Sequence, residues 1–300
     1  MKTLSVGIPA YNEEANIGYL IRDILHQAEE DYILEKIYVY SDGSTDRTNE
    51  IVRSFQNEKL ELIVGPGRQG QAVGQNHIVD ICESDCLILI NADMQVADYR
   101  AFTFLAKPIL EGTADLTSSN LQPLPPRTFL EGVLSLSARL KSILFEQYQD
   151  GHNLYTCRGA ARALSRRFYT SMRFPKSVGE DAYSYLACVS QGFTYHYAKE
   201  AIVYYRLPAI LADHRKQSTR FFNGTSNFVN EFGATFVAEH MRIPLSVILK
   251  GFWRALPEIL RHPIRVTCYL GILLLMRIES FFVKQASDTW MIAESSKQLR

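Results

Sequence analysis

Short apolar stretches alternate with helical segments over the first 120 residues, and this alternation constrains the fold more than any other feature. The apolar stretches have strand length, whereas the segments between them carry apolar residues at a spacing of three or four. Strands that alternate with helices in this way are buried on both faces of a sheet. The pattern predicts an α/β fold, with a doubly wound, Rossmann-like and mostly parallel sheet flanked by helices. The expected strands are Leu4–Ile8, Ile37–Tyr40, Leu60–Val64 and Cys86–Ile90, and the expected helices are Glu14–His26, Asp46–Phe55 and Gly70–Glu83.

A polar or glycine-rich turn follows each of the four expected strands. The carboxyl ends of parallel strands meet at one edge of a sheet, and ligands bind at that edge. We therefore expect the four turns to converge on one crevice. They are Pro9–Glu13, Ser41–Gly43, Gly65–Gln71 and Asn91–Asp93.

The chain after residue 120 first continues the mixture of helices and strands and then becomes a helical segment. Arg127–Gln149 and Glu180–Gln191 have helical spacing, whereas Gly151–Ala161 has the composition of a loop. Short strands are expected at Thr194–Tyr197 and Ile202–Tyr205. Because the sequence contains no internal repeat or low-complexity linker, we predict one domain followed by a helical segment. The predicted bounds are 1–225 for the domain, with halves at about 1–120 and 121–225, and 226–300 for the C-terminal helical segment.

The charge distribution limits the partners of the chain. Its 32 basic and 32 acidic side chains balance, which argues against nucleic acid as a partner. Residues 206–300 nevertheless hold 13 of the basic side chains and 7 of the acidic ones, so an anionic partner is expected for this part. Five scattered cysteines form neither a disulfide framework nor a zinc motif, and Met1–Thr3 leads straight into a strand instead of a signal peptide. We expect buried thiols and a cytoplasmic location.

The segment Ile243–Val283 alternates apolar blocks with basic residues. Its longest uncharged run, Val266–Met276, reaches about 16 Å as a helix, which is too short to cross about 30 Å of hydrocarbon. We interpret the segment as lying in the interface of an anionic membrane, on the cytosolic face, with Phe252 and Trp253 as anchors. A buried helical subdomain or an oligomer interface is the alternative. The basic residues are Lys250, Arg254, Arg261, Arg265 and Arg277.

Acidic and amide side chains at the expected strand ends suit a metal-bound nucleotide diphosphate. A divalent cation prefers oxygen ligands and neutralises the charge of phosphate oxygens. Asp93 follows the fourth strand and is the expected ligand, whereas Asn91 and Gln95 beside it offer weaker oxygen donors. Asp42 follows the second strand, where its carboxylate is placed to accept hydrogen bonds from a base. An aspartate after a strand is more often a turn or helix cap, so only the joint placement of these residues favours a site.

Several motifs occur in the order found in a known enzyme family. Leu4–Glu14, Ser41–Asp46, Gly70–Asn76 and Asn91–Asp93 resemble the motifs of family 2 glycosyltransferases of the GT-A fold. Further on, Gly179–Tyr183 resembles the acidic acceptor-side motif of this family. Gln217–Phe221 is similar to the Gln-x-x-Arg-Trp motif of its processive members. The resemblance covers roughly residues 1–225.

The resemblance implies an inverting glycosyltransferase that uses a nucleotide-diphosphate sugar, with a UDP-sugar favoured, and Mn²⁺ or Mg²⁺ as cofactor. The implied acceptor is a hydroxyl of a glycan or lipid-linked saccharide, in the synthesis of a cell-surface polysaccharide or glycolipid. Asp181 stands at the position of the general base, and Asp93 at the metal ligand beside the diphosphate. The other implied contacts are Pro9, Tyr11 and Glu13 with the nucleoside, Asp42 with the base, Arg68, Asn76, Asn91, Ala92 and Arg220 with the rest of the donor, and Glu180 and Gln217 on the acceptor side.

The sequence departs from the family pattern at three positions. Asn91 replaces the first acid of Asp-x-Asp, and Gln71 replaces a frequent lysine, which leaves a nucleotide-sugar binding protein without turnover as an alternative. Phe221 replaces the tryptophan of the processive motif, so single addition and polymerisation both stay open. Asn91–Gln95 is also similar to the Asp-Ala-Asp-x-Gln motif of polyprenyl-phosphate sugar synthases, which is the alternative acceptor class.

Two assignments have structural alternatives. Acids that open a helix, as Glu180 and Asp181 do, are favoured by the helix dipole alone. His152, His196 and His214 are additional metal-ligand candidates, although a lone histidine is more often structural, and His214 is the strongest because it is close to Arg220. A plain dinucleotide-binding enzyme is disfavoured, because Gly65–Gly70 follows the third strand and lacks the Gly-x-Gly-x-x-Gly pattern.

Overall fold

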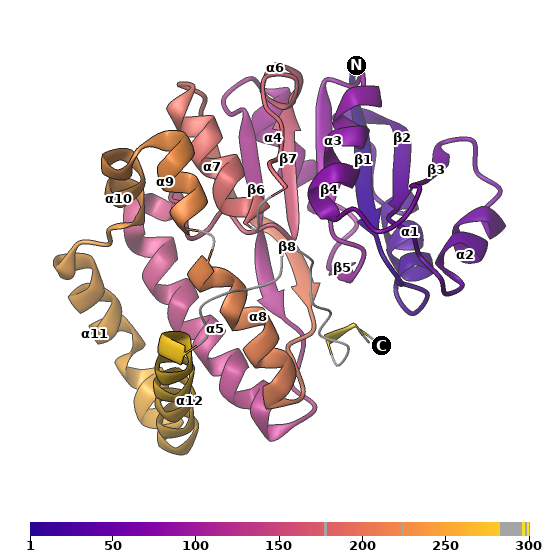
Figure 1. Cartoon of the computed structure of the whole chain (residues 1–300). Coiled ribbons are helices and arrows are strands. Elements are labelled where there is room, and N and C mark those ends of the chain that lie inside the picture. The colour runs from indigo at the N-terminus through magenta and orange to yellow at the C-terminus, as the bar shows by residue number, and fades with distance from the viewer. Residues whose placement is uncertain (177–178, 224, 283–295, 298, 300) are drawn as a thin grey trace.

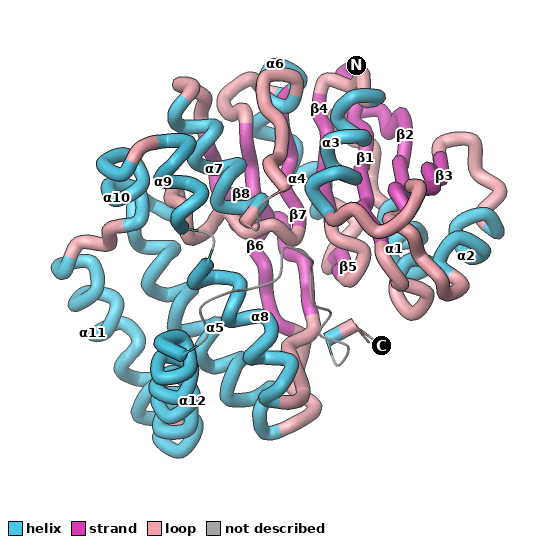
Figure 2. The backbone as a smooth tube through the Cα atoms, viewed as in Figure 1, coloured by secondary structure: helices cyan, strands magenta, loops and turns pink. Residues whose placement is uncertain are grey.

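The computed structural model describes residues 1–176, 179–223, 225–282, 296, 297 and 299, without the side chains of 218–223, 225, 226 and 279–282. Its described part is an eight-stranded mixed sheet with helices on both faces and a group of helices at one end (Figures 1 and 2). The strands are β1 (Lys2–Ala10), β2 (Tyr32–Ser41), β3 (Leu60–Val64), β4 (Cys86–Ile90), β5 (Met94–Val96), β6 (Leu116–Pro123), β7 (Ala161–Ser165) and β8 (Tyr195–Tyr205). The helices are α1 (Ile17–Leu25), α2 (Thr48–Ser54), α3 (Gln71–Ile81), α4 (Ala101–Leu110), α5 (Phe129–Gln147), the 3₁₀ turn Tyr148–Gly151, α6 (Arg166–Tyr169), α7 (Glu180–Ser190), α8 (Leu211–Asn223), α9 (Thr225–Phe232), α10 (Ala234–Met241), α11 (Leu245–Arg261) and α12 (Pro263–Phe282).

The strand order is β3-β2-β1-β4-β7-β6-β8-β5. The first four strands are parallel, as the sequence predicts, and their carboxyl ends point to the same edge. Beyond β4 the sheet is mixed, because β7 runs antiparallel to both β4 and β6, while β6 and β8 are parallel. The two short strands expected at 194–205 are the two ends of β8, which has an irregularity opposite Ser119 and Asn120 of β6. The strands β5, β6 and β7 and the helix α4 were not predicted.

Two hydrophobic clusters cover the two faces of the sheet. The first lies under α1, α2 and α4, where Ile17, Leu20, Ile21 and Ile24 of α1 are buried and Leu25 is partly buried. The second lies under α3, α6, α7, α9 and α10, and it includes Phe228 of α9 and Val237 of α10. Both clusters share the strands of the parallel half, so β1, β2 and β4 are covered on both faces, whereas the edge strand β3 is only partly buried. This burial explains the continuous apolar composition of β4, in which all five residues are buried.

The helices α11 and α12 pack against α5 at the end of the sheet opposite α6 and leave an apolar surface exposed (Figure 1). Within the described residues, no single helix has the length and hydropathy needed to cross a bilayer. The pair Ala234–Arg261 and Pro263–Ile278, bent by 117°, meets these criteria only when its two parts are taken together. The exposed large apolar side chains on α11 and α12 are Leu245, Ile248, Leu249, Phe252, Trp253, Leu260, Ile264, Leu270, Leu273, Leu274, Leu275 and Ile278.

Candidate active site

The turn after β1 is fastened to the loop after β2. Asn12 adopts a left-handed backbone conformation with φ of 51°, which is tolerated by asparagine more readily than by most residues. Its side-chain oxygen accepts a hydrogen bond from the Thr45 backbone at 2.8 Å, and the Glu13 backbone N–H donates to the Thr48 hydroxyl at 2.7 Å. These bonds present Tyr11 and Glu13 at the carboxyl edge of the sheet, and Pro9 is half-buried within β1 itself.

The carboxylate of Asp42 holds the loop that follows β3. It is 5% exposed and accepts hydrogen bonds from the backbone N–H groups of Gln69 at 2.7 Å and Gly70 at 2.8 Å. Gly43 makes this approach feasible, because a Cβ there would lie 2.8 Å from the backbone nitrogen of Arg68. The carboxylate has further lone pairs for a ligand. Its position confirms that the turns after β2 and β3 meet, whereas the predicted contact with a base stays a prediction.

The turns after β3 and β4 also meet, through the two residues that depart from the family pattern. The Gln71 amide donates to the Asn91 side-chain oxygen at 2.8 Å. Along this strand end, half-exposed Asn91, Asp93 and Gln95 alternate with buried neighbours. Ala92 is one of those neighbours, and its side chain is 3% exposed within the first hydrophobic cluster. Only its backbone is therefore available to a donor.

Glu13 and Asp93 bring two negative charges together at this edge. Burial and then the charge of Asp93 raise the pKa of Glu13 to about 7. The ammonium of Lys297 opposes this rise, since its Nζ lies 2.7 Å from Glu13 Oε1. Lys297 is a site residue that the sequence did not indicate, because nothing local marks a lysine that pairs with a turn at the other end of the chain.

These carboxylates fit a divalent cation that also binds phosphate oxygens. Within the described ranges, no group of three or more His, Cys, Asp or Glu side chains is arranged to hold a metal ion. Asp93, with its neighbour Glu13, offers hard oxygen donors, and the electrostatic repulsion between the two favours a cation beside them. His214 lies on α8, where burial and then the positive charge of Lys141 lower its pKa.

Two cations lie close to the ring of Tyr11. The Arg68 guanidinium carbon is 4.3 Å from the ring centre, and Lys297 Nζ is 5.9 Å from it. A guanidinium over an aromatic face is held by the ring quadrupole. The predicted pair Tyr11 and Arg68 is thus brought together, and a base that stacks on this face has to displace the guanidinium.

The acidic pair opens α7, as expected. Gly179, with φ of 110°, caps the helix, and its missing Cβ makes room for the Phe228 ring, which a Cβ would approach to 2.8 Å. Glu180 is 7% exposed, and burial raises its pKa to about 7. Asp181 is half-buried and accepts a hydrogen bond from the Ala182 backbone at 2.8 Å. The two carboxylates therefore have different surroundings.

Asp181 lies next to the strand end that carries Asp93. A Cβ on Gly159 would contact Asp181 Cβ at 3.4 Å, and the following residue, Ala160, accepts a hydrogen bond from the Asn91 backbone at 2.9 Å. Gly159 and Ala160, which lead into β7, therefore connect the predicted base to the strand end that carries the predicted metal ligand. The strand β7, which was not predicted, begins at Ala161 directly after these two residues and pairs with β4, so it fixes them beside Asn91.

Arg162 of β7, which was not predicted, packs against the start of α7 and supports the acidic pair. Its side chain is fully buried and donates from Nη1 to the Glu180 backbone carbonyl at 2.7 Å and to the Ser184 hydroxyl. Its charge also lowers the pKa of Glu180 against the effect of burial. An arginine inside the apolar stretch Ala161–Ser165 is the signal that could have identified it.

The other predicted residues serve the surroundings of the site. Asn76 uses its amide on the Phe174 backbone, with both bonds at 2.8 Å, and so fixes the loop that leads to α7. Gln217 of α8 donates to the Ser296 hydroxyl at 3.4 Å. Arg220 lies on α8, and its side chain is outside the described part of the structure.

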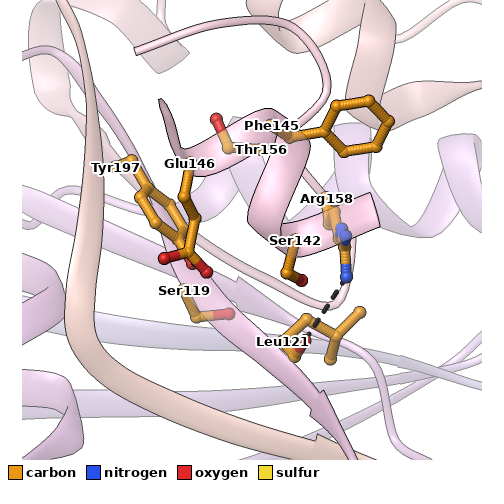
Figure 3. Close-up of a pocket in the computed structure, with 8 residues that line it drawn as sticks. All are labelled: Ser119, Leu121, Ser142, Phe145, Glu146, Thr156, Arg158 and Tyr197. Atoms are coloured by element: carbon orange, nitrogen blue, oxygen red, sulfur yellow. Dashed lines mark hydrogen bonds between the residues drawn. The ribbon is translucent and has the colours of Figure 1, made fainter. Parts of the chain in front are cut away.

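A small cavity is lined by residues of α5, β6, β8 and the segment that leads into β7 (Figure 3). Arg158 borders it and donates to the Leu121 carbonyl at 3.3 Å, while the Tyr197 hydroxyl lies 3.5 Å from a carboxylate oxygen of Glu146. The buried hydroxyl of Ser119 has no hydrogen-bond partner among the described residues. Because Arg158 directly precedes Gly159, the cavity adjoins the acidic pair. Its lining residues are Ser119, Leu121, Ser142, Phe145, Glu146, Thr156, Arg158 and Tyr197.

Comparison with protein families decides the relationship that these features indicate. The model of glycosyl transferase family 2 matches residues 5–170, which is more than half of the chain. The chain belongs to glycosyl transferase family 2. A second model, glycosyl transferase family group 2, matches residues 134–292 and thus extends over α11 and α12.

Curated relatives of this family 2 member match over part of its length. An uncharacterised glycosyltransferase of Synechocystis sp. is 31% identical over 94 residues, which cover 31% of this chain and 30% of that protein. The 4,4'-diaponeurosporenoate glycosyltransferase of Staphylococcus aureus is 29% identical over 115 residues, which cover 37% of this chain and 27% of that protein. The chain therefore spans less than a third of the length of these two relatives.

Solved structures share the fold. A Pyrobaculum calidifontis mannosyltransferase in complex with GDP-Man and Mn²⁺ has a TM-score of 0.64 at 14% identity, covering 95% of this chain and 88% of that one. Glucosyl-3-phosphoglycerate synthase of Mycobacterium tuberculosis in complex with Mg²⁺ and UDP has a TM-score of 0.56 at 18% identity, covering 77% and 80%. The predicted GT-A fold is confirmed.

Proposed function

We propose that this family 2 member transfers a sugar from a nucleotide-diphosphate sugar, with a UDP-sugar favoured, to a hydroxyl of a glycan or lipid-linked saccharide. The observation that carries the proposal is the placement of Asp181 beside the edge where Glu13 and Asp93 meet. One side of that edge then offers anionic oxygens for the metal ion that binds the donor diphosphate. The other side offers a base for the acceptor hydroxyl. The complexes of the structural neighbours with GDP-Man or UDP support a nucleotide sugar as donor.

The chemistry follows from a single displacement. Asp181 accepts the proton of the acceptor hydroxyl as the new bond to the anomeric carbon forms and the bond to the diphosphate breaks, which inverts that carbon. Asp93 would hold Mn²⁺ or Mg²⁺, with Asn91 and Gln95 as weaker ligands, and this ion would neutralise charge on the departing diphosphate. Arg68 stands at the same edge as a further cation. His214 of α8 stays a weaker candidate ligand, since burial and then the charge of Lys141 lower its pKa and so favour the neutral imidazole that binds a metal.

The test is nucleotide release from UDP-, GDP- and dTDP-sugars with Mn²⁺ and a lipid-linked acceptor extract. We expect release from one donor class, and its loss in Asp93→Ala, because the metal site then lacks its anionic oxygen. Asp31→Ala, on an exposed bend, is the matched control and should keep wild-type rates. Nucleotide binding without release would instead favour the binding protein without turnover. Nucleotide release only when a polyprenyl phosphate is the acceptor would favour a polyprenyl-phosphate sugar synthase.

We also propose that α11 and α12 hold the protein at the cytosolic face of a membrane, where a lipid-linked acceptor in polysaccharide or glycolipid synthesis is found. Twelve exposed large apolar side chains among the described residues of these helices support this proposal. So do the exposed Arg254 and Arg261 on α11, since anionic lipid attracts basic residues beside an apolar face. An interface in an oligomer is the competing use of the same surface.

A further inference from the structure

We propose that Lys297 is a positioning residue of the donor site, and that the residues around it link the two halves of the catalytic domain. We call Ser296, Lys297 and Leu299 the bridging residues. Their position beside the sheet, far from α12, can be followed in Figure 1, where the end of the chain is marked C. The inference rests on the proposed function, because it takes the turn Tyr11–Glu13 as part of the nucleotide-sugar site.

The ammonium of Lys297 is directed entirely at one turn. Its Nζ lies 2.7 Å from Glu13 Oε1 and donates to the backbone carbonyls of Tyr11 at 2.7 Å and Asn12 at 2.9 Å. An ammonium has three hydrogens, so these three acceptors use all of them. Lys297 therefore has no donor left for a phosphate, and its role is to hold the turn.

The positive charge of Lys297 also reduces the repulsion between the carboxylates of Glu13 and Asp93. Glu13 is 7% exposed and lies close enough to Asp93 for each charge to disfavour the other. A buried carboxylate is stable when a cation and hydrogen bonds satisfy its oxygens. Lys297 supplies the cation on one oxygen, and Asn16 donates to the other at 3.0 Å. Glu13 is thereby kept in place beside the predicted metal ligand.

The bridging residues are anchored on both halves of the domain. On the donor half, the Asn16 amide donates to the Lys297 carbonyl and accepts from the Leu299 backbone at 3.4 Å. On the acceptor half, the Leu299 carbonyl accepts hydrogen bonds from Arg127 and Arg206, each at 3.1 Å.

Arg206, which bonds the Leu299 carbonyl, is itself held in a fixed position. Arg206 is 7% exposed, lies 3.7 Å from Glu131 and donates to the Pro125 carbonyl at 2.8 Å. Ser296 adds a contact with Gln217 of α8. The bridging residues thus tie the turn after β1 to elements of the acceptor half.

The first experiment compares Lys297→Met with wild type, because methionine keeps an unbranched chain and removes the charge. We measure the calorimetric Kd for UDP with Mn²⁺ and the donor KM and kcat. We expect Kd and KM to rise at least about tenfold, since removing one partner of a buried ion pair leaves the other uncompensated, while kcat changes by less than about threefold. Lys297→Arg should restore part of the affinity, which a purely structural defect would not allow. Lys107→Met, on the exposed face of α4, is the matched control.

Two outcomes of this experiment would overturn the proposal. Unchanged donor affinity in Lys297→Met would show that the residue does not position the site. Tighter donor binding or a faster rate would show that the bridging residues compete with the donor for the turn.

A second measurement separates this inference from the proposed function. A double-mutant cycle of Glu13→Gln and Lys297→Met is read from urea unfolding midpoints, without any nucleotide. Non-additive midpoints support the contact, and additive midpoints refute it. If wild type binds none of the nucleotides, the proposed function fails, and the cycle still decides whether Lys297 holds the turn.

Discussion

Asp181 and Glu180 are adjacent in sequence but have different surroundings. Glu180 is almost fully buried over Arg162, and its pKa is raised to about 7, so part of it is protonated at neutral pH. Asp181 is half-buried beside Gly159, at the side of the crevice where an acceptor hydroxyl would arrive. Of the two, Asp181 has the access that proton transfer requires.

Replacement of Asp181 by asparagine tests this division of roles. We expect Asp181→Asn to bind UDP with Mn²⁺ as wild type does and to lose about 10²- to 10⁴-fold in transfer rate, the range for a general base. Calorimetry measures the binding, and nucleotide release measures the rate. A variant that fails to bind the donor, or to fold, would show that the side chain serves the start of α7 instead.

The pH dependence of stability tests the burial of Glu180. Its pKa is raised from 4.5 to about 7 in the folded state, so the folded state binds more protons than the unfolded state between these values. The contribution of Glu180 to the free energy of unfolding is therefore largest below about pH 4.5. It falls by roughly 3 kcal/mol as the pH rises to about 7. Urea unfolding of Glu180→Gln should lack this loss, so the difference between variant and wild type should grow from pH 5 to pH 8. Parallel curves would contradict the assignment.

At the scale of elements, the loop after β3 is held by a turn that only glycine permits. Gly43 has φ of 74°, and a Cβ there would lie 2.8 Å from two backbone atoms of that loop. We expect Gly43→Ala to lose about 1–3 kcal/mol of stability and most of its affinity for UDP, because the loop after β3 has to move away from Asp42.

Gly112 provides the control for this change. It has φ of 73° with nothing within 4 Å of an added Cβ, so Gly112→Ala measures the backbone strain without the collision. Chemical unfolding and UDP calorimetry of both variants give the comparison. Equal effects in the two would mean that strain, and not the approach of the loop, explains the result.

The elements that the sequence predicted are those with local signals. The strands β1 to β4 contain short apolar stretches that pack in the two hydrophobic clusters, and each ends in a turn whose polar residues do meet. The strand β6 was not predicted, because its residues Thr117–Asn120 are polar although they are buried. Its partner β7 contains the buried Arg162. Neither strand has the apolar composition by which the others were found, and polar groups such as the Ser118 hydroxyl and Arg162 Nη1 bond to residues distant in sequence.

Within the site, the same distinction holds. Asp42 and Asp93 could be placed at a strand end from the sequence alone. The contact of Gln71 with Asn91 joins residues 20 positions apart and could not, and the pairing of Lys297 with the turn after β1 joins opposite ends of the chain. Composition reports burial, whereas long-range pairing depends on the finished sheet order.

At the scale of the whole molecule, the exposed apolar surface of α11 and α12 predicts binding to anionic vesicles. We expect the protein to float with anionic vesicles, less so as salt rises, and not with neutral ones. The double variant Arg254→Glu/Arg261→Glu should bind at least about tenfold more weakly, since each basic residue near such a surface contributes about 1 kcal/mol.

The control places the same charge change elsewhere. Lys59→Glu/Lys107→Glu alters two lysines away from α11 and α12 and should float as wild type does. If both double variants lose binding equally, the attraction is a matter of net charge alone. A monomer–dimer equilibrium unaffected by vesicles, with no flotation, would favour the oligomer interface.

The contact between Lys297 and the Tyr11 carbonyl spans 286 positions, and this separation sets an order of events during synthesis. At about 5–20 residues per second, the ribosome adds Lys297 roughly 15–60 s after Tyr11. The strands β1 to β4 can pair during that interval. The bonds between the turn after β1 and Lys297 can form only after it. A message cut shortly before Ser296 would therefore yield a chain with its sheet complete, whose donor turn keeps its bonds to the loop after β2 and lacks those from Lys297.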